Sequence, residues 1–190
     1  MDERTTRDLL LALDSDYQQC SEQIIKRLDE GDKGDDGITR ADTDFDARQL
    51  IRSTFAYIEG AMFVLKIEAS FNADEKGVEL SHQQQQFIFE RSFSLNDKGD
   101  VCEHDAKISL TRNIRFAFSV FAEANKIENI LDVGSNWWSK LKSSIKVRDR
   151  LTHPRFPVDL DVSPKELIDA MSAKNGFDET LYKMIKASKA

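Results

Sequence analysis

Glycine and proline, the two residues that most often interrupt regular structure, are scarce in this chain. Eight glycines and three prolines are spread over 190 residues. A β-sandwich or barrel needs many tight turns, so this scarcity disfavours both architectures. It favours a few long helices joined by a handful of loops. Hydrophobic residues make up 40% of the chain, which is enough to build a core at this length.

Apolar residues recur at steps of three and four over most of the chain, the pattern of helices with one buried face. The expected helices span residues 5–30, 44–70, 81–91, 106–127, 135–152 and 163–186. Ser81 and Ser163 each precede a Gln or Glu by three residues, which is the capping-box pattern of a helix start. Gly60 within the second helix predicts a close approach by another helix, and Gly176 predicts a break in the last one.

Residues 93–95 and 100–102 flank a polar turn and predict a small β-hairpin. We therefore expect an all-α fold, a bundle of four to five helices into which one short β-hairpin can be inserted. The length is that of one domain over residues 1–190.

The formal net charge is −7, so the chain as a whole is not an obvious nucleic-acid binder. Cys20 and Cys102 lack the paired spacing of a metal site, and we expect reduced thiols in a cytoplasmic protein. The start, Met1-Asp2-Glu3, is not that of a secretory signal. No stretch approaches the roughly 18 apolar residues of a membrane span, so no membrane is expected among the partners.

One short part of the chain has the opposite charge balance. Residues 140–155 contain six basic side chains and one acidic one, Asp149. A local basic strip on an acidic body favours contact with phosphate groups. The candidate RNA-binding residues in this strip are Lys142, Lys146, Arg150 and Arg155.

Arg148 occupies a place in the 135–152 helix where a core residue is expected. The apolar stripe there runs through Trp138, Leu141 and Ile145, and Arg148 is its next member. An arginine at such a place must be paired or must face a polar cleft. Pro154 ends the helix and pushes the preceding His153 out of helical geometry, so the imidazole is free to turn toward the helix end that Arg148 also reaches.

An arginine and a histidine that meet at a helix end suit phosphate chemistry. Arginine offers a planar, permanently charged fork to phosphate oxygens, and histidine takes or gives a proton near neutral pH. The 2′-hydroxyl of RNA is an internal nucleophile, so its attack needs a base or acid and a cation, with no metal and no cofactor. Arg148 and His153 are the candidate catalytic residues, with Asp149 or Thr152 orienting the imidazole or positioning the backbone.

The stretch Arg148-Asp149-Arg150-Leu151-Thr152-His153 resembles the signature of the HEPN superfamily, Arg-(Asn/Asp/His)-x-x-x-His near a helix end. The likeness extends to the preceding amphipathic helix, to Trp137-Trp138 at its start and to the helix that opens after Ser163. It implies a bundle of four or five helices. It also implies a metal-independent endoribonuclease, usually a homodimer, in which two motifs face one cleft and cleavage leaves a 2′,3′-cyclic phosphate.

The resemblance also implies partners and supporting residues. Members often act as toxins or in defence against phage, which points to RNA and to a cognate antitoxin or other partner protein. The commonest residue after the motif arginine is Asn, whereas this chain has Asp149, which brings negative charge close to the phosphate. A polar residue of an early helix often supports the motif arginine, and Glu59 is the candidate here.

Two other functions remain open at this point. Some members of the superfamily have lost activity, so the alternative is a catalytically inactive HEPN-like dimer that binds a protein or a nucleotide. The third is a helical regulatory module outside this superfamily. A metal at Cys102-Glu103-His104-Asp105 lacks a second ligand cluster, and calcium at residues 31–37 lacks the order of a calcium loop, so we interpret that segment as a connection.

Overall fold

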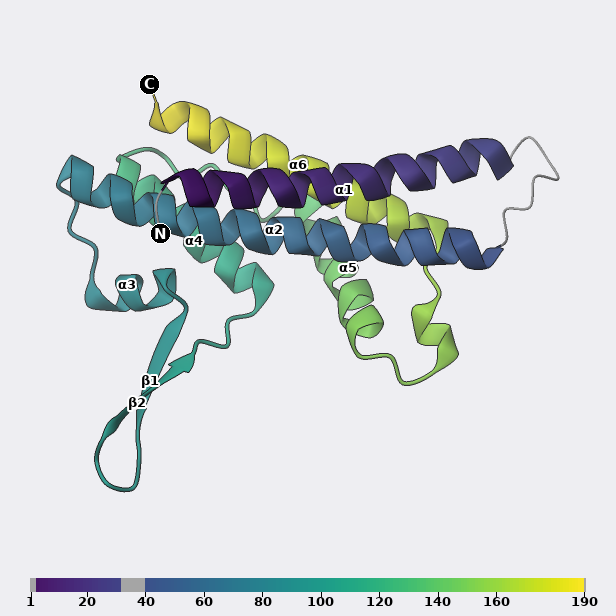
Figure 1. Cartoon of the computed structure of the whole chain (residues 1–190). Helices are drawn as coiled ribbons and strands as arrows, with labels where there is room; N and C mark the ends of the chain where they lie inside the picture. The colour runs from purple at the N-terminus through teal and green to yellow at the C-terminus, as the bar shows by residue number, and fades with distance from the viewer. Residues whose placement is uncertain (1–2, 32–39, 190) are drawn as a thin grey trace. The chain divides into compact units, whose positions relative to one another are not determined.

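The computed structural model describes residues 3–31 and 40–189 (Figure 1). Their elements, in chain order, are α1 (Glu3–Gly31), α2 (Arg40–Lys76), α3 (His82–Ile88), β1 (Arg91–Leu95), β2 (Val101–Asp105), α4 (Leu110–Asn125), α5 (Asn136–Thr152), the 3-10 helix η1 (Pro157–Leu160) and α6 (Pro164–Ser188). Within the described ranges there are thus five long α-helices, one short one and an antiparallel hairpin. The expectation of an all-α fold with a short β-hairpin is confirmed. In the same part of the chain, no helix has the length and apolarity that crossing a membrane requires.

Serine side chains form capping hydrogen bonds at the start of three of the described helices. The Ser81 hydroxyl accepts a hydrogen bond from the Gln84 amide, and the Gln84 side chain accepts one from the Ser81 amide, which is a full capping box. Ser163 and Glu166 form the same reciprocal pair ahead of α6. The Ser135 hydroxyl accepts from the Trp138 amide at the start of α5. These bonds satisfy amide groups that a helix leaves without internal partners.

Two helices run further than their apolar patterns predict. The α2 helix continues past residue 70 and ends where Gly77 adopts a φ of 62°. The Val78 amide then bonds to the Ala73 carbonyl, which is the closing turn that a left-handed glycine permits. The predicted break at Gly176 is wrong, because α6 passes through it without interruption. The ring of Trp137 packs where a Gly176 side chain would lie, so this glycine serves helix packing.

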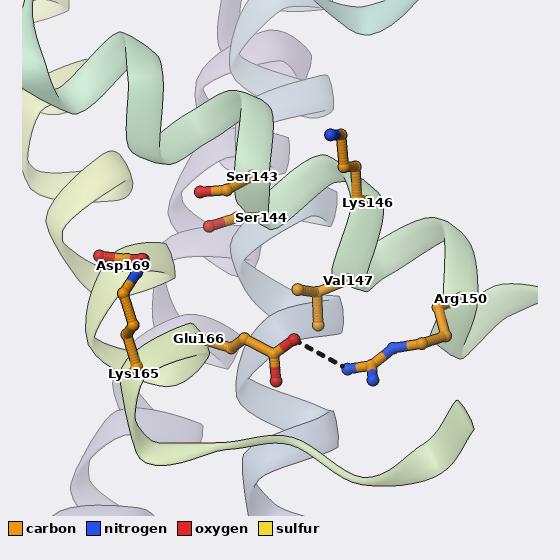
Figure 2. A pocket seen from close by; sticks show the side chains of 8 residues that line it. All are labelled: Ser143, Ser144, Lys146, Val147, Arg150, Lys165, Glu166 and Asp169. Carbon is orange, nitrogen blue, oxygen red and sulfur yellow. Dashed lines mark hydrogen bonds and ion pairs between the residues drawn. The ribbon is translucent and has the colours of Figure 1, made fainter. Parts of the chain in front are cut away.

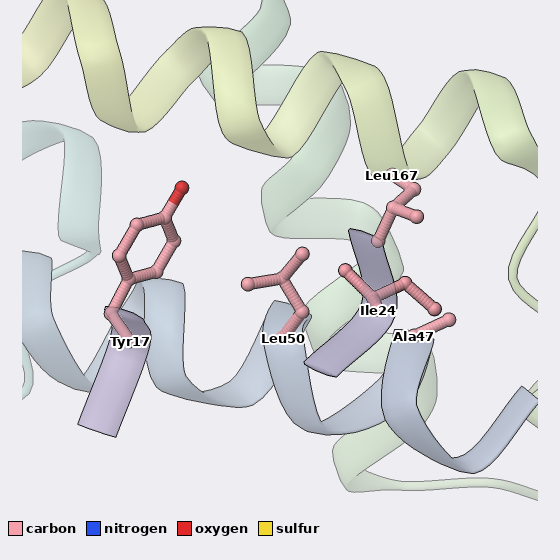
Figure 3. Packing of buried hydrophobic residues seen from close by; sticks show 5 residues of the cluster. All are labelled: Tyr17, Ile24, Ala47, Leu50 and Leu167. Carbon is pink, nitrogen blue, oxygen red and sulfur yellow. The ribbon is translucent and has the colours of Figure 1, made fainter. Parts of the chain in front are cut away.

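The chain groups into two compact units. The first unit comprises residues 1–60 and 132–180, and thus holds α1, the first part of α2, α5, η1 and most of α6. One of its buried clusters consists of Tyr17, Ile24, Ala47, Leu50 and Leu167, drawn from α1, α2 and α6 (Figure 3). Trp138 and Leu141 of α5 are also buried in the unit. Gly60 of α2 is closely approached by the Leu13 side chain of α1, as its place in the helix predicted.

The second unit comprises residues 61–131 and 181–190. It holds the rest of α2, α3, the hairpin, α4 and the end of α6. Its buried residues include Met62, Ile88, Ile114, Phe118 and Met184. The hairpin pairs Arg91 with Asp105 at its base and Leu95 with Val101 near its turn.

Candidate functional site

The site lies in the first unit, where α5 ends. His153 follows the last helical residue with φ −127° and ψ 58°, so it has left helical geometry as the following Pro154 requires. Its amide still donates to the Asp149 carbonyl at 3.0 Å, which closes the last turn. The motif residues 148–153 therefore form the last turn of α5 and its C-cap, and the buried face of the helix ends there at Leu151, which is 2% exposed.

Arg148 is held by three groups. Its guanidinium lies 5.2 Å from the centre of the Phe55 ring and donates through Nη1 to Glu59 Oε1. Nε and Nη2 donate to Asp149 Oδ1 at 3.1 and 2.9 Å. The side chain is 25% exposed, so it is partly buried. The arginine that interrupts the apolar stripe is thus paired, and its partners are two carboxylates and an aromatic face.

The partners on α2 come from one face of that helix. Phe55 and Glu59 follow Arg52 by three and seven residues, which places all of them on one side of a helix. Arg52 reaches the same helix end as Arg148, with Nη2 3.5 Å from the Leu151 carbonyl. Glu59 was predicted from the sequence, whereas Arg52 and Phe55 were not. Their spacing from Glu59 was the signal that could have found them. Residues four and seven positions before Glu59 lie on the same face of α2, so they are placed near Arg148 as well.

Asp149 and Thr152 are occupied with the helix and with Arg148. The Asp149 carboxylate accepts from Arg148. The Thr152 hydroxyl donates to the Arg148 carbonyl one turn back at 2.8 Å. Neither side chain forms a hydrogen bond with the imidazole of His153, which is exposed and has no hydrogen-bond partner within residues 3–31 and 40–189. Arg148 is therefore paired with Glu59 and Asp149, whereas the His153 side chain is exposed to solvent.

The basic strip is divided among several faces. Lys142 and Lys146 are exposed on α5, but six- and two-residue steps turn them about 120° and 160° away from Arg148 around the helix axis. Arg150 bonds to the Asp161 carbonyl at 2.8 Å and to the Glu166 carboxylate at 3.2 Å. Arg155 is exposed in the loop after α5. The four candidate RNA-binding residues do not form one continuous surface with Arg148.

Two carboxylates near the strip are held in their charged form. Burial alone would raise the pKa of Glu166, but hydrogen bonds from the Ser163 amide and hydroxyl and the charge of Arg150 outweigh it and lower that pKa. Hydrogen bonds from the Arg155 and Phe156 amides lower the pKa of Asp159. Because both acids stay ionised at neutral pH, they fix the loop between α5 and α6 through Arg155 and Arg150.

The other candidate ligand groups do not converge. Cys102 and His104 point to one face of β2 and Glu103 and Asp105 to the other, since side chains alternate along a strand. His104 Nε2 lies 2.7 Å from the Ser94 hydroxyl. In the described part of the chain, no three His, Cys, Asp or Glu residues are grouped to hold a metal ion. Apart from Gly31, the glycine-rich segment 31–37 lies outside the described residues.

The Arg148 guanidinium at the end of α5 is shared with two carboxylates. Its bonds to Glu59 and Asp149 use three of its five N–H groups and leave one on Nη1 and one on Nη2 for an anion, which would then lie close to both carboxylates.

Searches against protein-family models, curated proteins and solved structures found no match for this chain.

Proposed function

We propose that this protein is a metal-independent endoribonuclease of the HEPN type, with a toxin-like or defence role. The observation that carries the proposal is the ion pair between Arg148, on the buried face of α5, and Glu59 of α2. The pair lies at the edge of the helix contact, with the Arg148 side chain 25% exposed and the Glu59 side chain 51% exposed. A permanently charged guanidinium that is held in one orientation and still reaches solvent is suited to binding a phosphate group.

In the proposed reaction, His153 accepts the proton of a ribose 2′-hydroxyl. The 2′-oxygen attacks phosphorus, and the bond from phosphorus to the 5′-oxygen breaks. The leaving 5′-oxygen takes a proton from an acid, a role that suits a protonated histidine of a second copy of the chain. Arg148 balances the negative charge that gathers on the phosphate oxygens. The products are a 2′,3′-cyclic phosphate and a 5′-hydroxyl.

One observation favours the alternative, a catalytically inactive HEPN-like dimer that binds a protein or a nucleotide. Arg148 is bound on both sides by carboxylates, and Asp149 accepts two of its hydrogen bonds. An arginine with a structural role has such partners, whereas a phosphate-binding arginine is expected to present one edge of its guanidinium to solvent.

The experiment that separates the two is RNA cleavage in the presence of EDTA. We expect cleavage by the unaltered chain, and a loss of about 10²- to 10⁴-fold in rate in His153→Ala, which removes the base. His82→Ala is the matched control, since His82 is also exposed and lies at the start of α3. Both variants are checked for folding by circular dichroism and for oligomeric state by light scattering.

The outcomes are distinct. Absence of cleavage by the folded, dimeric, unaltered chain contradicts the ribonuclease and supports the inactive dimer. Cleavage that His153→Ala retains contradicts the assigned role of His153. A chain that stays monomeric at the concentrations where it cleaves RNA contradicts the shared cleft, since two copies of the motif must then be unnecessary.

A further inference from the structure

The charges around Arg148 do not by themselves attract phosphate. Arg148 carries one positive charge, whereas its two partners, Glu59 and Asp149, carry two negative charges. These three side chains together therefore have a net charge of −1. Because phosphate groups are negatively charged, the proposed cleavage of RNA needs a further cation close to Arg148.

The other arginines that follow Arg148 in the chain are held elsewhere. A two-residue step turns Arg150 about 160° away from Arg148 around the helix axis. Figure 2, a view into the pocket between α5 and the start of α6, shows the Arg150 guanidinium paired with the Glu166 carboxylate. Arg155 lies in the loop after α5, where its amide donates to Asp159 at 2.7 Å. No contact in the described part of the chain places either of these two side chains beside Arg148.

Arg52 of α2 reaches this end of α5 from outside the motif. Its Nη2 donates to the Leu151 carbonyl at 3.5 Å, which is a long hydrogen bond. This single bond leaves four of the five N–H groups of the guanidinium unused. The Arg52 side chain is exposed, and within residues 3–31 and 40–189 it is paired with no carboxylate. Its positive charge is therefore available to an anion.

The contact with Leu151 places Arg52 on the side of Arg148 where α5 ends. Leu151 follows Arg148 by three residues, which is about 4.5 Å along the helix axis. It also precedes His153 by two residues, so the Arg52 contact lies between Arg148 and His153 along the chain. Glu59, seven residues after Arg52 on the same face of α2, contacts Arg148 itself.

We propose that Arg52 is a phosphate-binding residue of this site and holds a phosphate group of the RNA strand at the end of α5. The choice of RNA rests on the proposed function, whereas the need for a further cation rests on the charges alone. Arg52 brings the net charge of the four side chains from −1 to zero. Its guanidinium can keep the Leu151 carbonyl and still present two parallel N–H groups to phosphate oxygens.

The test measures binding in place of cleavage. A short 2′-O-methyl RNA, which has no free 2′-hydroxyl and cannot be cleaved, is titrated into the full chain at several salt concentrations and followed by fluorescence anisotropy. Arg52→Gln should weaken RNA binding about tenfold, the effect of losing one charge-assisted hydrogen bond. The slope of log affinity against log salt should become shallower by about one, because one phosphate contact is lost. Arg52→Lys keeps the charge and should retain the slope.

Arg48→Gln is the matched control. Arg48 lies one turn earlier on α2 and also bonds to a backbone carbonyl, from Nη1 to Leu160 at 3.3 Å. Both substitutions remove one positive charge and one such bond, so a structural role alone predicts equal effects. Equal RNA affinity and salt slope in Arg52→Gln and Arg48→Gln overturn the proposal. Circular dichroism checks that both variants are folded.

AMP distinguishes a free nucleotide from an RNA strand as the source of the phosphate group. It is titrated into the same variants and followed by calorimetry. If Arg52→Gln weakens the binding of AMP and leaves RNA affinity unchanged, the choice of an RNA strand is overturned.

The two proposals fail independently. RNA binding that depends on Arg52, in a chain that cleaves no RNA, contradicts the ribonuclease and supports phosphate binding by Arg52. Cleavage that disappears in His153→Ala, with RNA affinity indifferent to Arg52, supports the ribonuclease and overturns the phosphate contact.

Discussion

Asp149 is the residue that most directly limits what Arg148 can do. Its carboxylate accepts from two guanidinium nitrogens of Arg148, at 3.1 and 2.9 Å, and it is 58% exposed. Glu59 holds the other side of the guanidinium. Any phosphate that approaches Arg148 meets two negative charges around one positive charge. The HEPN signature that this stretch resembles most often has the uncharged Asn at this place.

We predict that Asp149→Asn increases RNA affinity and, if the chain is a ribonuclease, its cleavage rate. The amide keeps the size of the side chain but removes its charge, and an exposed ion pair is worth up to roughly 1 kcal/mol, so the gain should be about fivefold. Fluorescence anisotropy with a 2′-O-methyl RNA measures the affinity, and a cleavage time course measures the rate. Asp97→Asn in the hairpin turn removes an equal charge as a control. No change relative to that control would show that Asp149 does not restrain Arg148.

At the scale of elements, α5 and α6 are fitted to each other through a tryptophan and a glycine. Atoms of the Trp137 side chain lie where a Cβ on Gly176 would be placed, with Trp137 Cδ1 at 2.8 Å from that position. The helix contact therefore depends on the missing side chain. Gly60 of α2 is also closely approached, but there the neighbour is the terminal methyl group of Leu13, and the next nearest atom is 3.7 Å away.

These two glycines should respond differently to alanine. Gly176→Ala should lower the free energy of unfolding by roughly 1–3 kcal/mol, since the indole cannot move aside without shifting the helix. Gly60→Ala should change it by less than about 1 kcal/mol, because a flexible methyl group can yield and alanine favours the helix. Urea denaturation of both variants measures the difference. If Gly176→Ala is as stable as the unaltered chain, the close contact between α5 and α6 at Gly176 is contradicted.

The elements were largely predictable from the sequence, and their ends less so. Ser81 and Ser163 begin helices as their local patterns indicated, because a capping bond spans only three residues. Gly176 was misread as a break, because its role depends on Trp137, which lies nearly forty residues earlier in the chain. Arg52 lies on the same face of α2 as Glu59, but its bond to the Leu151 carbonyl could not be predicted, because spacing within α2 does not show which part of α5 that face contacts.

At the scale of the folded molecule, a fully buried lysine ties three segments of the second unit together. Lys66 of α2 donates to the Glu90 carboxylate at 2.5 Å, next to the hairpin, and to the Asn113 amide oxygen of α4 at 3.0 Å. Glu90 adopts a φ of 54°, which is uncommon outside glycine. Burial lowers the pKa of Lys66, and the hydrogen bond and charge of Glu90 offset this only in part.

Stability should therefore rise with pH on the alkaline side. The unfolded chain keeps the Lys66 proton up to about pH 10.4, whereas the folded chain releases it earlier, so the unfolded state binds more protons in that window. The cost of burying the charge is then relieved as pH rises from the folded to the unfolded pKa. Relative to Lys66→Met, the unaltered chain should gain stability in urea as pH rises toward the unfolded-state pKa of lysine. Lys107→Met, at an exposed position, is the control, and parallel profiles for all three proteins would exclude the effect.

Local patterns in the sequence were enough to predict the helical class of this protein, the starts of α3, α5 and α6, and the stretch from Arg148 to His153 as the candidate site. Those features depend on periodicity, on capping bonds and on Pro154, all of which act over a few residues. Only the tertiary structure decided how the side chains of α5 are partnered. Arg148 is held by Glu59 of α2, Arg150 is tied to Glu166 of α6, and the Ser144 hydroxyl lacks a partner among the described residues. These features depend on which helix faces lie against each other, and that is decided by the packing of the whole core.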